Sequence, residues 1–140
     1  MLKVVYDTNV VVSGLLNEEG IPASLLDLAL QRKVELFLSP HLLEEYKGVL
    51  TRSKFGFSGV LVSRFLVQLK RNGVLVEPET SLRVLKKDPD DNRILECALE
   101  AKASYIITGN IRHFPFKRFR SSKIVSPTKF WEVYKASIKV

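Results

Sequence analysis

Short apolar segments alternate with segments of helical period along the chain, and this alternation constrains the fold more than any other feature. The apolar segments LKVVYD, VELFLS, GVLVEP, SYIIT and KIVS have the length and composition of strands. Helices are expected near residues 10–17, 22–33, 40–51, 58–72, 89–102 and 127–137. Strands that alternate with helices build a parallel sheet, and right-handed crossovers place the helices on both of its faces. The sequence therefore predicts an α/β protein, a three-layer α/β/α sandwich with a mostly parallel central sheet.

Length and cysteine content indicate the number of domains and the compartment. A chain of 140 residues is long enough to bury its own core, so one domain over residues 1–140 is expected. Its one cysteine, Cys97, lies in the apolar stretch ILECALEA, which is typical of a reduced, packed thiol. We find no leader pattern at the N-terminus, and no segment approaches the ~18 apolar residues that a membrane span needs. A soluble cytoplasmic protein without a membrane partner is the expectation.

The charge balance favours an anionic partner. The chain has 22 Lys and Arg residues against 15 Asp and Glu residues, a formal net charge of +7. Nucleic acid is the obvious candidate, although many basic proteins bind no anion. In the segment NIRHFPFKRFRSSK, the aromatic rings could stack on unpaired bases, but we expect Phe114, Phe116 and Phe119 to pack inward instead. The cations expected to contact RNA phosphates are Arg112, Lys117, Arg118 and Arg120.

Polar side chains follow two of the expected strands. Asp7, with Thr8 and Asn9, comes directly after LKVVY, whereas Thr108 and Asn110 come after SYII. Either group could be an ordinary turn, because these residue types are common in turns. Ligands of parallel α/β proteins, however, bind at the carboxyl ends of the strands. The Asp7 carboxylate, the Thr108 hydroxyl and the Asn110 carbonyl oxygen are therefore candidate site groups.

Helical phase distinguishes the carboxylates of two helices. In SPHLLEEYKGVL, Glu45 lies at the edge of the apolar stripe, whereas Glu44 lies nearly opposite its centre. In DPDDNRILECALEAK, Asp91 lies one turn before Ile94, on the apolar side of the helix. Both residues have an alternative role: Glu45 as a solvent-facing acid, and Asp91 as a partner of the helix dipole. The residues expected on the far side of the second helix are Asn92, Arg93 and Glu96.

These four places would share one edge of a parallel sheet, so their oxygens can converge on a cation. Three carboxylates without a matching set of His or Cys residues suit Mg²⁺ or Mn²⁺ better than zinc. His41 and His113 offer base catalysis as a weaker alternative, because no nucleophile motif accompanies them.

In this order, the motifs VVYDTNVVVSGL, LSPHLLEEYKGVL, DPDDNRILECALEAKASYIITGN and RHFPF resemble the PIN-domain ribonuclease family, especially the VapC-like toxins of prokaryotic toxin–antitoxin systems. The resemblance covers nearly the whole chain and implies a single PIN-like domain. It implies that Asp7, Glu45 and Asp91 bind divalent metal, and that Thr108 supplies a hydroxyl beside them. Where this chain has Asn110, the family often has a fourth acidic residue. An amide can ligate a metal without adding charge.

The resemblance implies an endoribonuclease that hydrolyses RNA phosphodiester bonds with Mg²⁺ or Mn²⁺, the toxin partner of a cognate antitoxin. An RNA-binding module with weak or absent catalysis is the alternative. A phosphohydrolase of the haloacid-dehalogenase kind ranks last, because it usually has a second Asp at the place of Asn9. A homodimer is a further expectation. The apolar residues that could serve either the core or a dimer face are Leu25, Leu28, Leu61 and Phe65.

Overall fold

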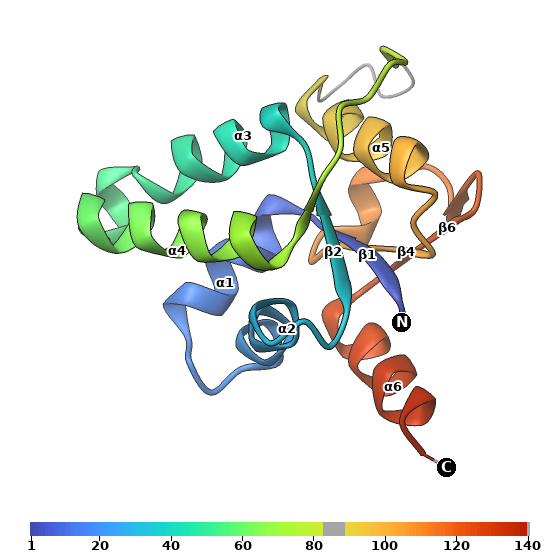
Figure 1. The fold of residues 1–140 in the computed structure, drawn as a ribbon, viewed down its shortest axis with the longest axis horizontal. Helices are drawn as coiled ribbons and strands as arrows, with labels where there is room; N and C mark the ends of the chain where they lie inside the picture. The colour runs from blue at the N-terminus through green and yellow to red at the C-terminus, as the bar shows by residue number, and fades with distance from the viewer. Residues whose placement is uncertain (83–88, 140) are drawn as a thin grey trace.

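Within residues 1–82 and 89–139, the part of the chain that this computed structural model describes, six strands form one sheet (Figure 1). For residues 89–91 only the backbone is described. The strands are β1 (Lys3–Tyr6), β2 (Glu35–Leu38), β3 (Val74–Leu75), β4 (Tyr105–Ile107), β5 (Arg118–Phe119) and β6 (Ser122–Val125). Their order is β3-β2-β1-β4-β6-β5, and all neighbours are parallel except β5 and β6. The expected α/β class and mostly parallel sheet are confirmed.

The helices begin close to the expected positions because capping residues mark their starts. The side-chain oxygens of Asp7, Ser39, Ser58 and Ser126 each accept a hydrogen bond from a backbone amide in the first turn of a helix. The α-helices are α1 (Thr8–Leu16), α2 (Ile21–Leu30), α3 (Pro40–Leu50), α4 (Gly59–Asn72), α5 (Pro89–Ala101) and α6 (Pro127–Ser137). Two 3-10 helices are η1 (Ser53–Phe55) and η2 (Ile111–His113).

The helices lie against both faces of the sheet (Figure 1). On one face α5 packs against β1, β2 and β4, and on the other α2 packs against α1, α4 and α6. Helix α3 contacts α1, α4 and α5, so it lies where the two helical layers meet at the carboxyl edge of the sheet. Leu25 and Leu28 belong to the buried core, whereas Phe65 is half-buried and Leu61 is exposed. In the described part of the chain, no helix has the length and apolar character needed to cross a bilayer.

The side of α5 that faces away from Ile94 is also buried, which the sequence pattern does not indicate. Asn92 and Glu96 are only 3% and 6% exposed. The backbone at Leu82 covers this side: its amide donates to Glu96 Oε2 at 2.6 Å, and its carbonyl accepts from Arg93 Nη2 at 3.1 Å. Arg93 Nε and Glu96 Oε1 form an ion pair at 2.9 Å. Because these charges neutralise each other, the helix can bury both of its sides.

Candidate active site

Asp7 lies between the end of β1 and the start of α1. Its amide donates to the Ile107 carbonyl at 2.9 Å, which continues the pairing of β1 with β4 by one residue. Its Oδ1 accepts from the Thr8 amide at 2.7 Å, and its Oδ2 accepts from the Thr108 hydroxyl at 2.8 Å. The structure therefore brings Asp7 and Thr108 together, although 101 positions separate them in the sequence.

Burial dominates the electrostatics of Asp7. The side chain is 6% exposed, and this desolvation raises the pKa of its carboxyl group. Hydrogen bonds from Thr108, Thr8 and Asn9 oppose the rise in pKa, as does the charge of His113. Among the residues that the structure describes, no Lys or Arg forms an ion pair with Asp7. A buried carboxylate held by neutral donors is a group whose charge a cation can compensate.

One residue, Thr8, connects Glu45 to Asp7 by hydrogen bonds. The Thr8 hydroxyl donates to Glu45 Oε2 at 2.7 Å, while the Thr8 amide binds Asp7. Glu45 is half-buried and Glu44 is exposed, as helical phase predicts for α3. Two of the expected acidic residues therefore lie together at the carboxyl edge of the sheet, and their oxygens suit a hard divalent cation.

Asn9 connects the ends of β1 and β4 by hydrogen bonds, a role that its local sequence does not indicate. Its Nδ2 donates to Asp7 Oδ2 at 3.0 Å and approaches Thr108 Oγ1 at 3.4 Å, and its Oδ1 accepts from the Gly109 amide at 2.7 Å. A Cβ at Gly109 would stand 3.1 Å from Asn9 Oδ1, so a glycine suits this close approach. The only sequence signal was the position of Asn9 after a strand, because its partners are about 100 residues away.

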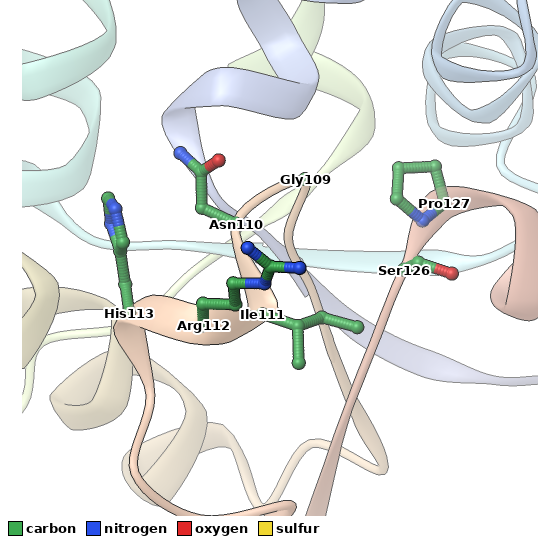
Figure 2. A pocket seen from close by; sticks show the side chains of 7 residues that line it. All are labelled: Gly109, Asn110, Ile111, Arg112, His113, Ser126 and Pro127. Carbon is green, nitrogen blue, oxygen red and sulfur yellow. The ribbon is translucent and has the colours of Figure 1, made fainter.

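Asn110 lies at the rim of the cluster. Its amide donates to Thr108 Oγ1 at 3.0 Å, and its exposed side chain is one of those that line an open pocket. Figure 2 shows this pocket between η2 and the start of α6. The structure thus places Asn110 beside the site through its backbone.

The Asp91 side chain lies outside the described residues, so its expected place in the site is untested. Its backbone belongs to the first turn of α5. Among the described side chains, no group of three or more His, Cys, Asp and Glu residues could hold a metal ion. Asp7 and Glu45 are the two expected metal ligands whose side chains are described.

Buried tyrosines tie α3 to the end of β1. The Tyr46 hydroxyl donates to the Tyr6 carbonyl, and the Tyr6 hydroxyl donates to the Leu25 carbonyl at 2.8 Å. Burial raises the pKa of both phenols, and the nearby charges of Asp7 and Glu45 raise that of Tyr46 further. Both phenols are therefore neutral donors, and they hold the backbone just before Asp7.

Cys97 is an unreactive structural residue. It is fully buried on α5, and burial raises the pKa of its thiol to about 12, against the opposing effect of a hydrogen bond with Ser39. Ser39 in turn caps α3 by accepting from the Leu42 amide at 3.1 Å.

The basic segment, residues 110–123, begins in the lining of the pocket and continues into the β5–β6 hairpin. Its phenylalanines pack inward as expected: Phe114 is 5% exposed, while Phe116 and Phe119 are half-buried with ring centroids 5.6 Å apart. The expected phosphate contacts, all exposed, are Arg112, Lys117, Arg118 and Arg120.

Comparisons with known proteins agree with this geometry. The chain is 36% identical over 112 residues to the uncharacterized protein MJ1680 of Methanocaldococcus jannaschii. This match covers 78% of this chain and 71% of that protein. It has the fold of a chain in the crystal structure of DNA-bound VapBC from Salmonella typhimurium, with a TM-score of 0.58 and 18% identity over 91% of this chain and 99% of that one. The PIN domain family matches residues 3–112, which include Asp7, Glu45 and Thr108. The chain therefore belongs to the PIN domain family.

Proposed function

We propose that this protein is a divalent-metal-dependent endoribonuclease that hydrolyses RNA phosphodiester bonds. The observation that carries the proposal is the buried Asp7 carboxylate, which Thr108 and Asn9 hold in place and Thr8 links to Glu45. This cluster lies at the carboxyl ends of β1 and β4, the usual location of ligand sites in parallel α/β folds. Membership of the PIN domain family adds support.

We propose Asp7, Glu45 and Asp91 as the ligands of Mg²⁺ or Mn²⁺. When bound, the cation would supply Lewis-acid stabilisation of the charge that develops on the phosphodiester oxygens. Thr108 donates to one Asp7 oxygen and so fixes the direction in which the carboxylate presents its remaining lone pairs. The Thr8 hydroxyl likewise donates to one Glu45 oxygen. These hydrogen bonds hold each carboxylate in one orientation before the substrate arrives.

RNA is the proposed substrate because the chain is basic and one exposed cation, Arg112, lies near the cluster. The chain has a net charge of +7, and exposed Arg112 lies on η2, the element that follows β4 in the chain. The other proposed phosphate contacts are Lys117, Arg118 and Arg120; Arg118 and Arg120 lie near the start of β6, at the edge of the sheet opposite the cluster. These cations would steer a polyanion to the site and hold its backbone.

A toxin role, with a cognate antitoxin as partner and the cytoplasm as location, is the proposed biological setting. Its support is the VapBC fold match and the PIN domain family. Induced expression of the wild-type chain should arrest growth, whereas expression of Asp7→Asn should not. Equal growth of the two strains at equal protein levels would argue against a toxin.

Cleavage of a labelled single-stranded RNA tests the enzymatic proposal. The wild-type chain should cleave with Mn²⁺ or Mg²⁺ and lose activity in EDTA. Asp7→Asn and Asp91→Asn should be inactive, and calorimetry should show weakened Mn²⁺ binding for both. Glu44→Gln, an exposed neighbour of the site, is the matched control and should retain wild-type activity.

Metal-independent cleavage, or full activity of Asp7→Asn, would refute the proposal. RNA binding without cleavage would instead favour a non-catalytic RNA-binding module. That alternative draws its support from Asn110, which stands where an additional acid would strengthen metal binding.

A further inference from the structure

The pocket beside Asn110 is separate from the carboxylate cluster but shares an edge of the sheet with it. Its volume is about 450 Å³, and its lining comes from residues 109–113 and from Ser126 and Pro127. These residues follow the carboxyl ends of β4 and β6, while Asp7 follows β1, the other neighbour of β4. Neighbouring strands lie about 4.8 Å apart, so the pocket is within roughly two strand spacings of Asp7. The pocket is therefore within reach of an RNA strand that places a phosphate at Asp7.

The lining combines a cation with an apolar surface. Figure 2 shows the Arg112 guanidinium directed into the space that Asn110, Ile111, Ser126 and Pro127 border. Ile111 is 41% exposed, unusually open for a side chain of its kind, and none of the seven lining residues is acidic. Guanidinium groups bind phosphate through paired hydrogen bonds, and an exposed aliphatic surface beside an amide suits the face and edge of a base.

We propose that this pocket is a nucleotide subsite. It takes the nucleotide next to the scissile phosphodiester bond, with Arg112 on its phosphate and Ile111 against its base. The inference rests on the proposed function, since it names where the substrate strand lies relative to the Asp7 cluster. An inorganic phosphate ion would use Arg112 alone, whereas a nucleotide would use both sides of the pocket.

An NMR titration of the full ¹⁵N-labelled chain in EDTA separates these ligands. The probes are a 5′-phosphorylated dinucleotide, uridine and inorganic phosphate. The dinucleotide should shift the amides of Gly109, Ile111 and Arg112 at lower concentration than either uridine or phosphate. Equal affinity for phosphate and the dinucleotide would reduce the pocket to an anion site and overturn the proposal, as would shifts confined to other parts of the chain.

RNA binding measured in the Asp7→Asn background, in which the proposed cleavage should be lost, tests the two lining residues. Arg112→Gln should weaken binding of a single-stranded RNA by roughly 5-fold or more. It should also reduce the steepness with which the logarithm of the association constant falls with the logarithm of the salt concentration, by about 0.7. This is the value for one lost phosphate contact on a single strand. Ile111→Ala should weaken binding at an unchanged salt slope. Lys135→Gln, in the last turn of α6, is the control and should change affinity much less.

If Arg112→Gln and Lys135→Gln weaken binding equally, the pocket contributes only general charge and the proposal is wrong. The same holds if Ile111→Ala binds like its parent. Because binding is read without cleavage, a protein that fails every nuclease assay can still confirm this subsite. The failure of the inference and the failure of the proposed function are therefore distinguishable.

Discussion

Replacing Tyr46 with phenylalanine removes one hydroxyl from the connection between α3 and the end of β1. Tyr46 is fully buried, and its hydroxyl donates to the Tyr6 carbonyl. The phenylalanine ring fills the same space, so the substitution leaves no large cavity, but a buried carbonyl that loses its donor costs roughly 1–3 kcal/mol. We expect Tyr46→Phe to lower the free energy of unfolding by about 2 kcal/mol. The melting temperature should fall by roughly 6–10 °C for a chain of this size.

The same substitution should affect the candidate metal site. Tyr46 follows Glu45 and Tyr6 precedes Asp7, so this hydrogen bond holds the two acids at a fixed separation. We expect Tyr46→Phe to bind Mn²⁺ more weakly than wild type at a temperature where both proteins are folded. A weaker metal affinity in a folded protein would be a positioning effect rather than a loss of stability.

Thermal denaturation and Mn²⁺ calorimetry of purified Tyr46→Phe and wild type are the measurements. Tyr134→Phe is the matched control, because Tyr134 is also buried but its hydroxyl makes none of the described hydrogen bonds. Its melting temperature should stay close to wild type. An unchanged melting temperature for Tyr46→Phe would refute the reasoning, since it would mean that the hydroxyl contributes nothing to the α3–β1 connection.

Three further predictions concern the carboxylates and their neighbour. Glu45→Gln should suppress RNA cleavage and Glu44→Gln should not, since only Glu45 accepts from Thr8; the opposite result in a cleavage assay would contradict this. Asn110→Asp adds a negative charge near the proposed metal, so the metal concentration for half-maximal cleavage should fall, and an unchanged value would exclude Asn110 from the site. Burial raises the pKa of Asp7 above its ordinary value of 3.8, so the unfolded chain ionises first as pH rises. In EDTA, the free energy of unfolding of wild type relative to Asp7→Asn should therefore fall as pH rises from 3.8 towards the raised pKa of Asp7 in the folded state. Denaturant melts of both proteins measure this difference, and a difference that does not change with pH would contradict the prediction.

Much of the fold could be predicted because its signals are local. A serine followed by a proline marks the start of two helices, and both signals lie in adjacent residues: Ser39–Pro40 and Ser126–Pro127. The structure begins α3 and α6 at these prolines. Strand β5 carries no such signal. Arg118 and Phe119 become a strand only by pairing with Lys123 and Ser122, across a turn in which Arg120 takes a φ of 55°.

The candidate site could be predicted only in part. Each polar residue at a strand end was visible, because Asp7 and Thr108 interrupt apolar runs. The hydrogen bonds that organise them were not visible, because Asn9 contacts Gly109 across 100 positions and nothing in either local sequence specifies the other. Two-sided burial of α5 was missed for a related reason: the cover comes from Leu82, which is not a neighbour of Glu96 in the sequence.

The buried thiol of Cys97 gives this protein a built-in reporter of local opening. With a pKa of about 12, the thiol is almost wholly protonated at neutral pH, and its place on α5 hides it from reagents. Alkylation can proceed only when the elements that cover the thiol open locally, so its rate measures how often that opening occurs. Because Asp91, a proposed metal ligand, lies on the same helix, labelling with and without Mn²⁺ would test whether metal binding slows this opening.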